Sequence, residues 1–217
     1  MAAFDLEEQE QLSQIKGWWE QYGKLVTGAA VAAALVSVGW QGWNWHQGKQ
    51  TAEAAALYAV VQQAAASKNA QQAKETAGLL IEGYGGTVYA DLGALLAAKI
   101  QIDAGDSKNA RAQLGWAAEN ARDPLLKDLA RLRLAALLLD EKSYDEALAR
   151  LQATPDDSLV ARFADLRGDV LFAQGKTDEA RKAYQVAVDD LTKTSRAEAV
   201  ALREIVQAKL DVIGGGQ

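Results

Sequence analysis

The sequence predicts an all-α protein, with one membrane-spanning helix near the N-terminus followed by a solenoid of helical hairpins. Three observations support this prediction. Alanine and leucine are frequent and only two of the 217 residues are proline, which favours helix. One long uncharged run lies near the N-terminus. After residue 46, apolar residues recur at helical spacing, with helix-start signals between them.

The uncharged run, 25–45, is long enough to cross a bilayer. It has 21 residues, and a helix that rises about 1.5 Å per residue can span a hydrocarbon core of about 30 Å at that length. Tryptophans stand on both sides of it, at positions 18, 19, 40, 43 and 45. Because tryptophan prefers the membrane–water interface, two such belts indicate a transmembrane helix over residues 24–46.

Two alternatives to a transmembrane anchor are a buried core helix and a cleaved signal peptide. Residues 1–24 contain five acids and two lysines, whereas a signal peptide begins with a short basic stretch. An uncleaved signal anchor is therefore favoured. The basic residues on the two sides nearly balance, but Lys24 adjoins the run and favours a cytoplasmic N-terminus. Residues 1–23 are then a short cytoplasmic tail, which either forms an amphipathic helix through Phe4, Leu6, Leu12 and Ile15 or stays disordered.

Residues 47–217 are predicted to form the solenoid. Asp123 and Pro124 are an N-cap followed by proline at the first helical position. Ser143 with Glu146 and Ser195 with Glu198 are candidate capping boxes. Two further helices are expected over 51–67 and 69–83, and the glycines of 82–86 predict a turn rather than a phosphate loop. Three apolar stripes each mark one face of a predicted helix: Leu125, Leu129, Leu132, Ala136 and Leu139; Leu159, Phe163, Leu166, Val170 and Ala173; and Ala201, Ile205, Ala208 and Val212.

The hairpins follow a spacing that resembles the tetratricopeptide repeat. The repeat has set positions for close helix crossing, for the turn and for the residue that fills the gap between hairpins. These positions are matched by Gly168, Gly175, Ala180, Tyr184 and Ala187. Ala147 and Leu151 stand 33 residues before Ala180 and Tyr184. A still earlier copy has Gly105, Ala110, Leu114 and Ala117. Ala164 and Thr192 depart from the consensus. We therefore expect three degenerate units with extra helices on either side.

No motif for catalysis, cofactor binding or metal binding stands out, so no site residue of these kinds is predicted. Cysteine is absent, and His46 is the only histidine, at the expected membrane border. The acid pairs 156–157, 178–179 and 189–190 are expected to be solvated caps, since adjacent helical residues point about 100° apart. The net charge of −6 gives no basic patch for nucleic acid.

The layout as a whole resembles the family of ancillary SecYEG translocon subunits. The likeness covers nearly the full chain and rests on four segments: FDLEEQEQLSQIKGWWEQYGK, YGGTVYADLGALLAAKIQIDAGD, WAAENARDPLLKDLARLRLAALLLDEKSYDEALARL and RGDVLFAQGKTDEARKAY. The resemblance implies a single-pass protein of the bacterial inner membrane, with its N-terminus in the cytoplasm and its repeats in the periplasm.

The resemblance also implies partners. These are the SecYEG translocon and a membrane-anchored periplasmic chaperone, and the implied role is to help relay secreted proteins from translocon to chaperone. Unfolded secreted proteins are a further candidate partner, beside the lipid bilayer. The alternative is a membrane-anchored scaffold for another cell-envelope assembly machine, and a third hypothesis is an anchored enzyme.

Overall fold

The structure is a computed structural model that describes residues 2–193 and 196–214, with side chains from residue 11 onward. Every regular element in these ranges is a helix, which confirms the predicted all-α class. The chain divides into two compact units, residues 1–50 and 51–217. Helix α1 (Ala2–Ala66) contributes residues to both.

The first unit is a single helical segment. Within Gln11–Ala66 of α1 lies an 18-residue window of mean hydropathy 1.5 whose residues are wholly unburied. A core helix of a soluble domain would be covered by other elements, so the segment is a membrane-capable helix, as predicted. Helix already begins at Ala2, so the tail is helical rather than disordered. Leu12 and Ile15 are largely exposed, whereas Phe4 and Leu6 lie outside the described side chains.

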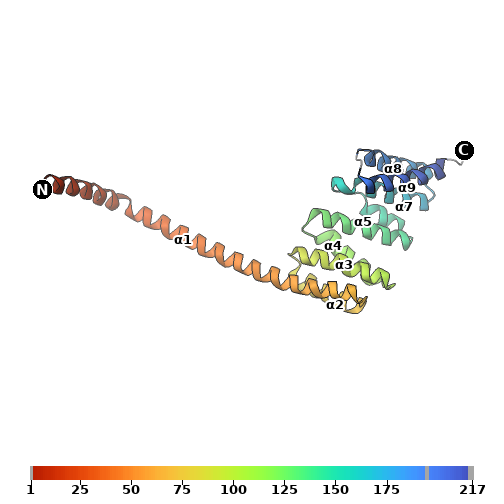
Figure 1. The fold of residues 1–217 in the computed structure, drawn as a ribbon, viewed down its shortest axis with the longest axis horizontal. Coiled ribbons are helices and arrows are strands. Elements are labelled where there is room, and N and C mark those ends of the chain that lie inside the picture. Colours follow the sequence, from red (N-terminus) through yellow and green to blue (C-terminus); the bar gives the residue numbers. More distant parts are fainter. Residues whose placement is uncertain (1, 194–195, 215–217) are drawn as a thin grey trace. The chain divides into compact units, whose positions relative to one another are not determined.

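The second unit is a stack of helical hairpins (Figure 1). It begins with the end of α1, and its remaining elements are α2 (Ala70–Tyr84), α3 (Val88–Asp103), α4 (Ser107–Asn120), α5 (Pro124–Asp140), α6 (Tyr144–Arg150), the 3-10 helix η1 (Asp157–Leu159), α7 (Val160–Ala173), α8 (Thr177–Leu191) and α9 (Ala197–Gly214). Helix α5 contacts both α3 and α7, and the three helices form one layer. Each also packs on the helix that follows it, so α4, α6 and α8 form a second layer.

Four hairpin turns in the described residues share one backbone conformation. The left-handed residues are Lys68, Gly105, Lys142 and Gly175, with φ of 55°, 79°, 61° and 78°. The next residue in each case donates its N–H to a carbonyl five residues back, as Asp106 does to Gln101 at 2.8 Å, which is the Schellman closure of a helix. The glycines at 105 and 175 were predicted turn residues. The hairpin of α1 and α2 adds a fourth unit to the three predicted ones.

The predicted helix caps are only partly correct. Asp123 accepts the N–H groups of Leu125 and Leu126 at 2.8 and 3.1 Å, with Pro124 directly after it. Ser143 stands at the N-cap of α6 but makes no side-chain cap bond, so the predicted capping box is wrong. Its partner Glu146 pairs instead with Arg111 at 2.6 Å. The box at Ser195 lies outside the described residues.

The three predicted apolar stripes differ in burial. In the stripe of η1 and α7, Leu159, Phe163 and Val170 are buried, although Ala173 is exposed. In α5 the predicted stripe is exposed or only partly buried, and the core side is formed by Ala130, Leu134, Ala135, Leu137 and Leu138. In α9 the predicted stripe is wholly exposed, and Val206 and Leu210 face the core. Both helices are apolar on more than one side, and periodicity alone does not say which side a neighbour will cover.

Gly168 leaves room for an aromatic ring from the next helix. An added Cβ there would overlap the ring of Tyr184, which is 2% exposed. Tyr184 therefore lies over Gly168 inside the hairpin of α7 and α8, and it also lines a hollow beside α9. The prediction that residue 168 must be small is confirmed, and the residue that requires it is Tyr184.

Candidate protein-binding surface

The side of α3, α5 and α7 that faces away from the second layer is apolar at its centre. We call this surface the inner face and define it by Leu92, Leu96, Leu125, Leu129, Leu132, Ala136 and Leu166. Leu125 is 43% exposed and the others are partly buried. Because α5 contacts both α3 and α7, these residues form one surface rather than three separate stripes.

Helix α5 carries the middle of the inner face because it is apolar on two opposite sides. Leu134 and Leu138 pack in the core against α4 and α6. At about 100° per residue, Leu125, Leu132 and Ala136 lie roughly opposite Leu134. An ordinary surface helix has a polar outer side, so a second apolar side on a central helix is typical of a surface that binds other proteins.

The inner face is bordered by charged side chains. On α3, Lys99 and Asp103 form an ion pair at 2.8 Å on the same side as Leu92 and Leu96. On α7, Arg162 and Asp169 lie on the same side as Leu166. An apolar centre with a polar rim is the usual organisation of a protein–protein interface.

Buried aspartates fix the connections behind this surface. Asp91 is fully buried, and its Oδ2 accepts the N–H of Arg122, at the junction of α4 and α5, at 3.1 Å. Asp128 makes the equivalent bond at the junction of α6 and α7, where one of its oxygens accepts the N–H of Asp156 at 3.0 Å. Its other oxygen accepts a hydrogen bond from Arg131 at 2.8 Å. These side chains hold successive hairpins together and so set the spacing of the inner-face helices.

The third aspartate of this series, Asp165, makes a different contact. It binds Nζ of Lys209 on α9 at 2.7 Å, and Lys209 also contacts both oxygens of Asp169 at 2.7 and 2.8 Å. Tyr184 donates its hydroxyl to Asp169 at 2.7 Å. Burial raises the pKa of Asp165, opposed by Lys209. Burial also disfavours the charge on Lys209, but its two carboxylate partners outweigh this effect and raise the pKa of the ammonium.

Asp91, Asp128 and Asp165 were missed in the sequence, although a signal was present. Each is followed by leucine, and the three stand 37 residues apart. A buried carboxylate at a fixed repeat position indicates a structural hydrogen bond, because a buried charge without a partner is costly. The tetratricopeptide spacing assigns only small and aromatic positions, so it did not reveal this series of aspartates.

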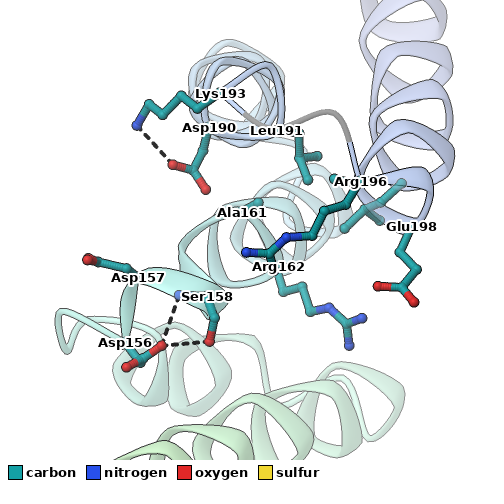
Figure 2. Close-up of a pocket in the computed structure, with 12 residues that line it drawn as sticks. Asp156, Asp157, Ser158, Ala161, Arg162, Asp190, Leu191, Lys193, Arg196 and Glu198 are labelled. Atoms are coloured by element: carbon teal, nitrogen blue, oxygen red, sulfur yellow. Dashed lines mark hydrogen bonds and ion pairs between the residues drawn. The ribbon is translucent and has the colours of Figure 1, made fainter.

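The acid pairs lie at helix ends and contact neighbours rather than each other. In Figure 2, Asp156 binds the N–H and hydroxyl of Ser158, at 2.9 and 2.6 Å, while Asp157 lies apart from it. Asp190 pairs with Lys193 at 2.9 Å. These groups line a hollow of about 480 Å³ with mixed charge, beside the N-terminus of α7. Asp178 pairs with Arg181 at 2.9 Å in the first turn of α8.

His46 lies exposed on α1 in the first unit. Among the described residues, no three His, Cys, Asp or Glu side chains come together in a group that could hold a metal ion. The chemistry on the surface of the second unit is that of apolar contact and ion pairing, which serves recognition.

The fold and the inner face define the class of the protein as a repeat scaffold. A family described as "Tetratricopeptide repeat-like domain" matches residues 16–215. The chain is 34% identical to an ancillary SecYEG translocon subunit of Neisseria gonorrhoeae, over 96% of this chain and 98% of that protein. It is 29% identical to a protein of the same description from Haemophilus influenzae, over 85% and 90%, and 28% identical to one from Escherichia coli, over 94% and 95%.

The chain belongs to the family of ancillary SecYEG translocon subunits with a tetratricopeptide repeat-like domain. This confirms the resemblance seen in the sequence. The family is one of non-enzymatic scaffolds, in agreement with the prediction that the chain is not an enzyme.

Proposed function

We propose that this protein is an ancillary subunit of the Sec translocon that binds partner proteins on its inner face and helps relay secreted proteins to periplasmic chaperones. The observation that carries the proposal is the second apolar side of α5, where Leu125 is 43% exposed and the other apolar residues are only partly buried. An apolar surface with a charged rim suits segments that are still unfolded, because such segments expose apolar side chains.

The proposed layout places residues 1–23 in the cytoplasm, residues 24–46 across the inner membrane and residues 47–217 in the periplasm. The exposed tryptophans at both ends of the apolar window support such a span. The chain has no cysteine, so one cysteine introduced near Gln217 can be labelled alone. Labelling of intact cells by a membrane-impermeant maleimide is expected, and protection until the inner membrane is opened would contradict the layout.

Site-specific photo-crosslinking tests the partners. A photoreactive residue at position 125 of the inner face, in intact membranes, is expected to yield adducts with translocon subunits and a membrane-anchored periplasmic chaperone. Position 79 on α2 is a matched control, since Leu79 is similarly exposed at 55% but lies outside the inner face. Adducts only with factors of another envelope assembly machine would favour the scaffold alternative and overturn the translocon role.

A second variant tests whether the inner face itself binds. Replacing Leu132 by aspartate puts a charge at the centre of the surface while leaving Leu134 and Leu138 in the core. We expect the adducts at position 125 to fall at least about tenfold, since a desolvated unpaired charge costs more than 1.4 kcal/mol at an interface. Unchanged adduct yield would show that the partners dock elsewhere.

A further inference from the structure

The last helix of the array has an exposed apolar stripe of its own. Ile205 is 56% and Val212 is 76% exposed, and Ala201 and Ala208 lie between and beside them on the same side of α9. At about 100° per residue, this side lies roughly opposite the core side formed by Val206 and Leu210. An ordinary surface helix has a polar outer side, whereas α9 is apolar both where it packs on α8 and on its exposed side.

The stripe faces a hollow between α7, α8 and α9. The hollow has a volume of about 350 Å³ and is lined by Asp169, Phe172, Tyr184, Ile205, Ala208, Lys209, Val212 and Ile213. Phe172 on α7 is 49% exposed and extends the apolar surface across from α9. Exposed apolar side chains from two neighbouring helices therefore meet at one end of the array, as they do where a further helix packs.

The charges around this surface are mostly negative. Asp165 and Asp169 together face the single ammonium of Lys209, which leaves a carboxylate in excess. Glu204 and Asp211 border the stripe on its other side. Arg203 lies about half a turn from the stripe and lines a second hollow with Glu204 and Asp211, and Arg181 pairs with Asp178 and donates to the carbonyl of Ile213.

We propose that the stripe and hollow of α9 bind an amphipathic helix of a partner protein that carries basic residues beside its apolar side. The acidic border selects this occupant by charge complementarity. A second copy of the chain would bring the same carboxylates together, and an anionic bilayer surface would repel them. The surface shares Asp169 with the rim of the inner face but none of the apolar residues that define that face, so the proposal does not depend on the translocon role.

Two synthetic 18-residue peptides test this proposal. Both carry leucine at helical i, i+3, i+4 and i+7 spacing, and they differ only in having lysine or glutamate at the flanking positions. Binding to the full-length chain in phosphatidylcholine nanodiscs is measured by fluorescence anisotropy, with empty nanodiscs as background. We expect the lysine peptide to bind at least about tenfold more tightly than the glutamate peptide.

Three variants locate the binding. Val212→Asp should abolish binding, and joint replacement of Glu204 and Asp211 by lysine should reverse the preference. Val186→Asp on α8 is the matched control because Val186 is similarly exposed, at 52%, and lies outside the hollow. Circular dichroism verifies that each variant folds. The proposal is overturned if the peptides bind equally or not at all, if V186D weakens binding as much as V212D does, or if sedimentation shows a dimer of the chain that V212D dissociates.

A failure of this experiment is distinguishable from a failure of the proposed function. Leu132→Asp should remove translocon and chaperone adducts at position 125 and leave peptide binding intact. Val212→Asp should remove peptide binding and leave the adducts at position 125 intact. One variant that removes both activities would contradict the separation of the two surfaces.

Discussion

The middle of the array and its C-terminal end use the same aspartate in different ways. Asp128 and Asp165 stand at equivalent repeat positions, but Asp128 binds a backbone N–H at the next junction and Asp165 binds the side chain of Lys209. A backbone bond fixes a connection whatever residue stands there, whereas a side-chain bond depends on one particular partner. Inside the array the aspartate therefore defines the spacing of the units, and at the end it attaches one helix.

The largest difference in the free energy of unfolding is expected between the variants that remove the carboxylates of Asp128 and Asp165. Asp128→Ala leaves a buried N–H and Arg131 without their acceptor, and we expect a loss of about 3 kcal/mol in the free energy of unfolding. Asp165→Ala leaves Lys209 paired with Asp169, so the expected loss is about 1 kcal/mol. Urea unfolding of both variants measures the difference. Equal losses would mean that Asp165 also fixes a connection.

Two glycines that face a side chain of the neighbouring helix are expected to give the opposite order, with the larger loss of stability near the C-terminal end. Gly168→Ala forces a methyl group against the rigid ring of Tyr184, with an expected loss of about 2–3 kcal/mol. Gly93→Ala brings a methyl group within 2.6 Å of the end of Leu80, which is a flexible side chain. For Gly93→Ala, the loss in the free energy of unfolding is expected to be under about 1 kcal/mol. Thermal unfolding distinguishes them, and a larger effect at position 93 would contradict this order.

Asp91 offers a test by pH. Burial raises the pKa of its carboxyl above the ordinary value, opposed by the backbone N–H groups of Arg122 and Asp123. The folded chain then holds the proton more tightly than the unfolded chain, so this group contributes less stability as pH rises from its ordinary pKa through its raised one. Asp91→Asn lacks this dependence. Urea unfolding at pH 7, 5.5 and 4 should show the stability difference shifting towards the wild type at low pH. No shift would mean that Asp91 stays ionised without penalty.

The smallest expected effect is a gain at the turns. Lys142 has a left-handed backbone that glycine adopts without strain, as Gly105 and Gly175 do at their turns. Because glycine also makes the unfolded chain more flexible, Lys142→Gly is expected to raise the free energy of unfolding by only about 0.5 kcal/mol. The midpoint of urea unfolding measures this gain. A loss would show that the lysine side chain is needed there.

The sequence predicted the class of fold and the hairpin turns because these depend on local signals. Asp123 with Pro124 and the glycines at 105 and 175 act within a few residues of their own position. The buried sides of α5 and α9 depend on which helices pack against them, and that information is spread over the whole chain. The apolar stripe of α5 was therefore found in the sequence, but only the fold shows that it is partly exposed and that most of it lies on the inner face.

The spacing of the left-handed turns bears on how such a chain changes length. Lys68, Gly105 and Lys142 stand 37 residues apart, and Asn69 and Asp106 each cap the helix that follows. Excision of residues 69–105 would join Lys68 to Asp106, so a left-handed residue would again precede a capping side chain. The array is thus divided into units of 37 residues that are interchangeable at their ends. Gene duplication or deletion in steps of 37 residues would give each new junction the same left-handed backbone conformation that the existing junctions have.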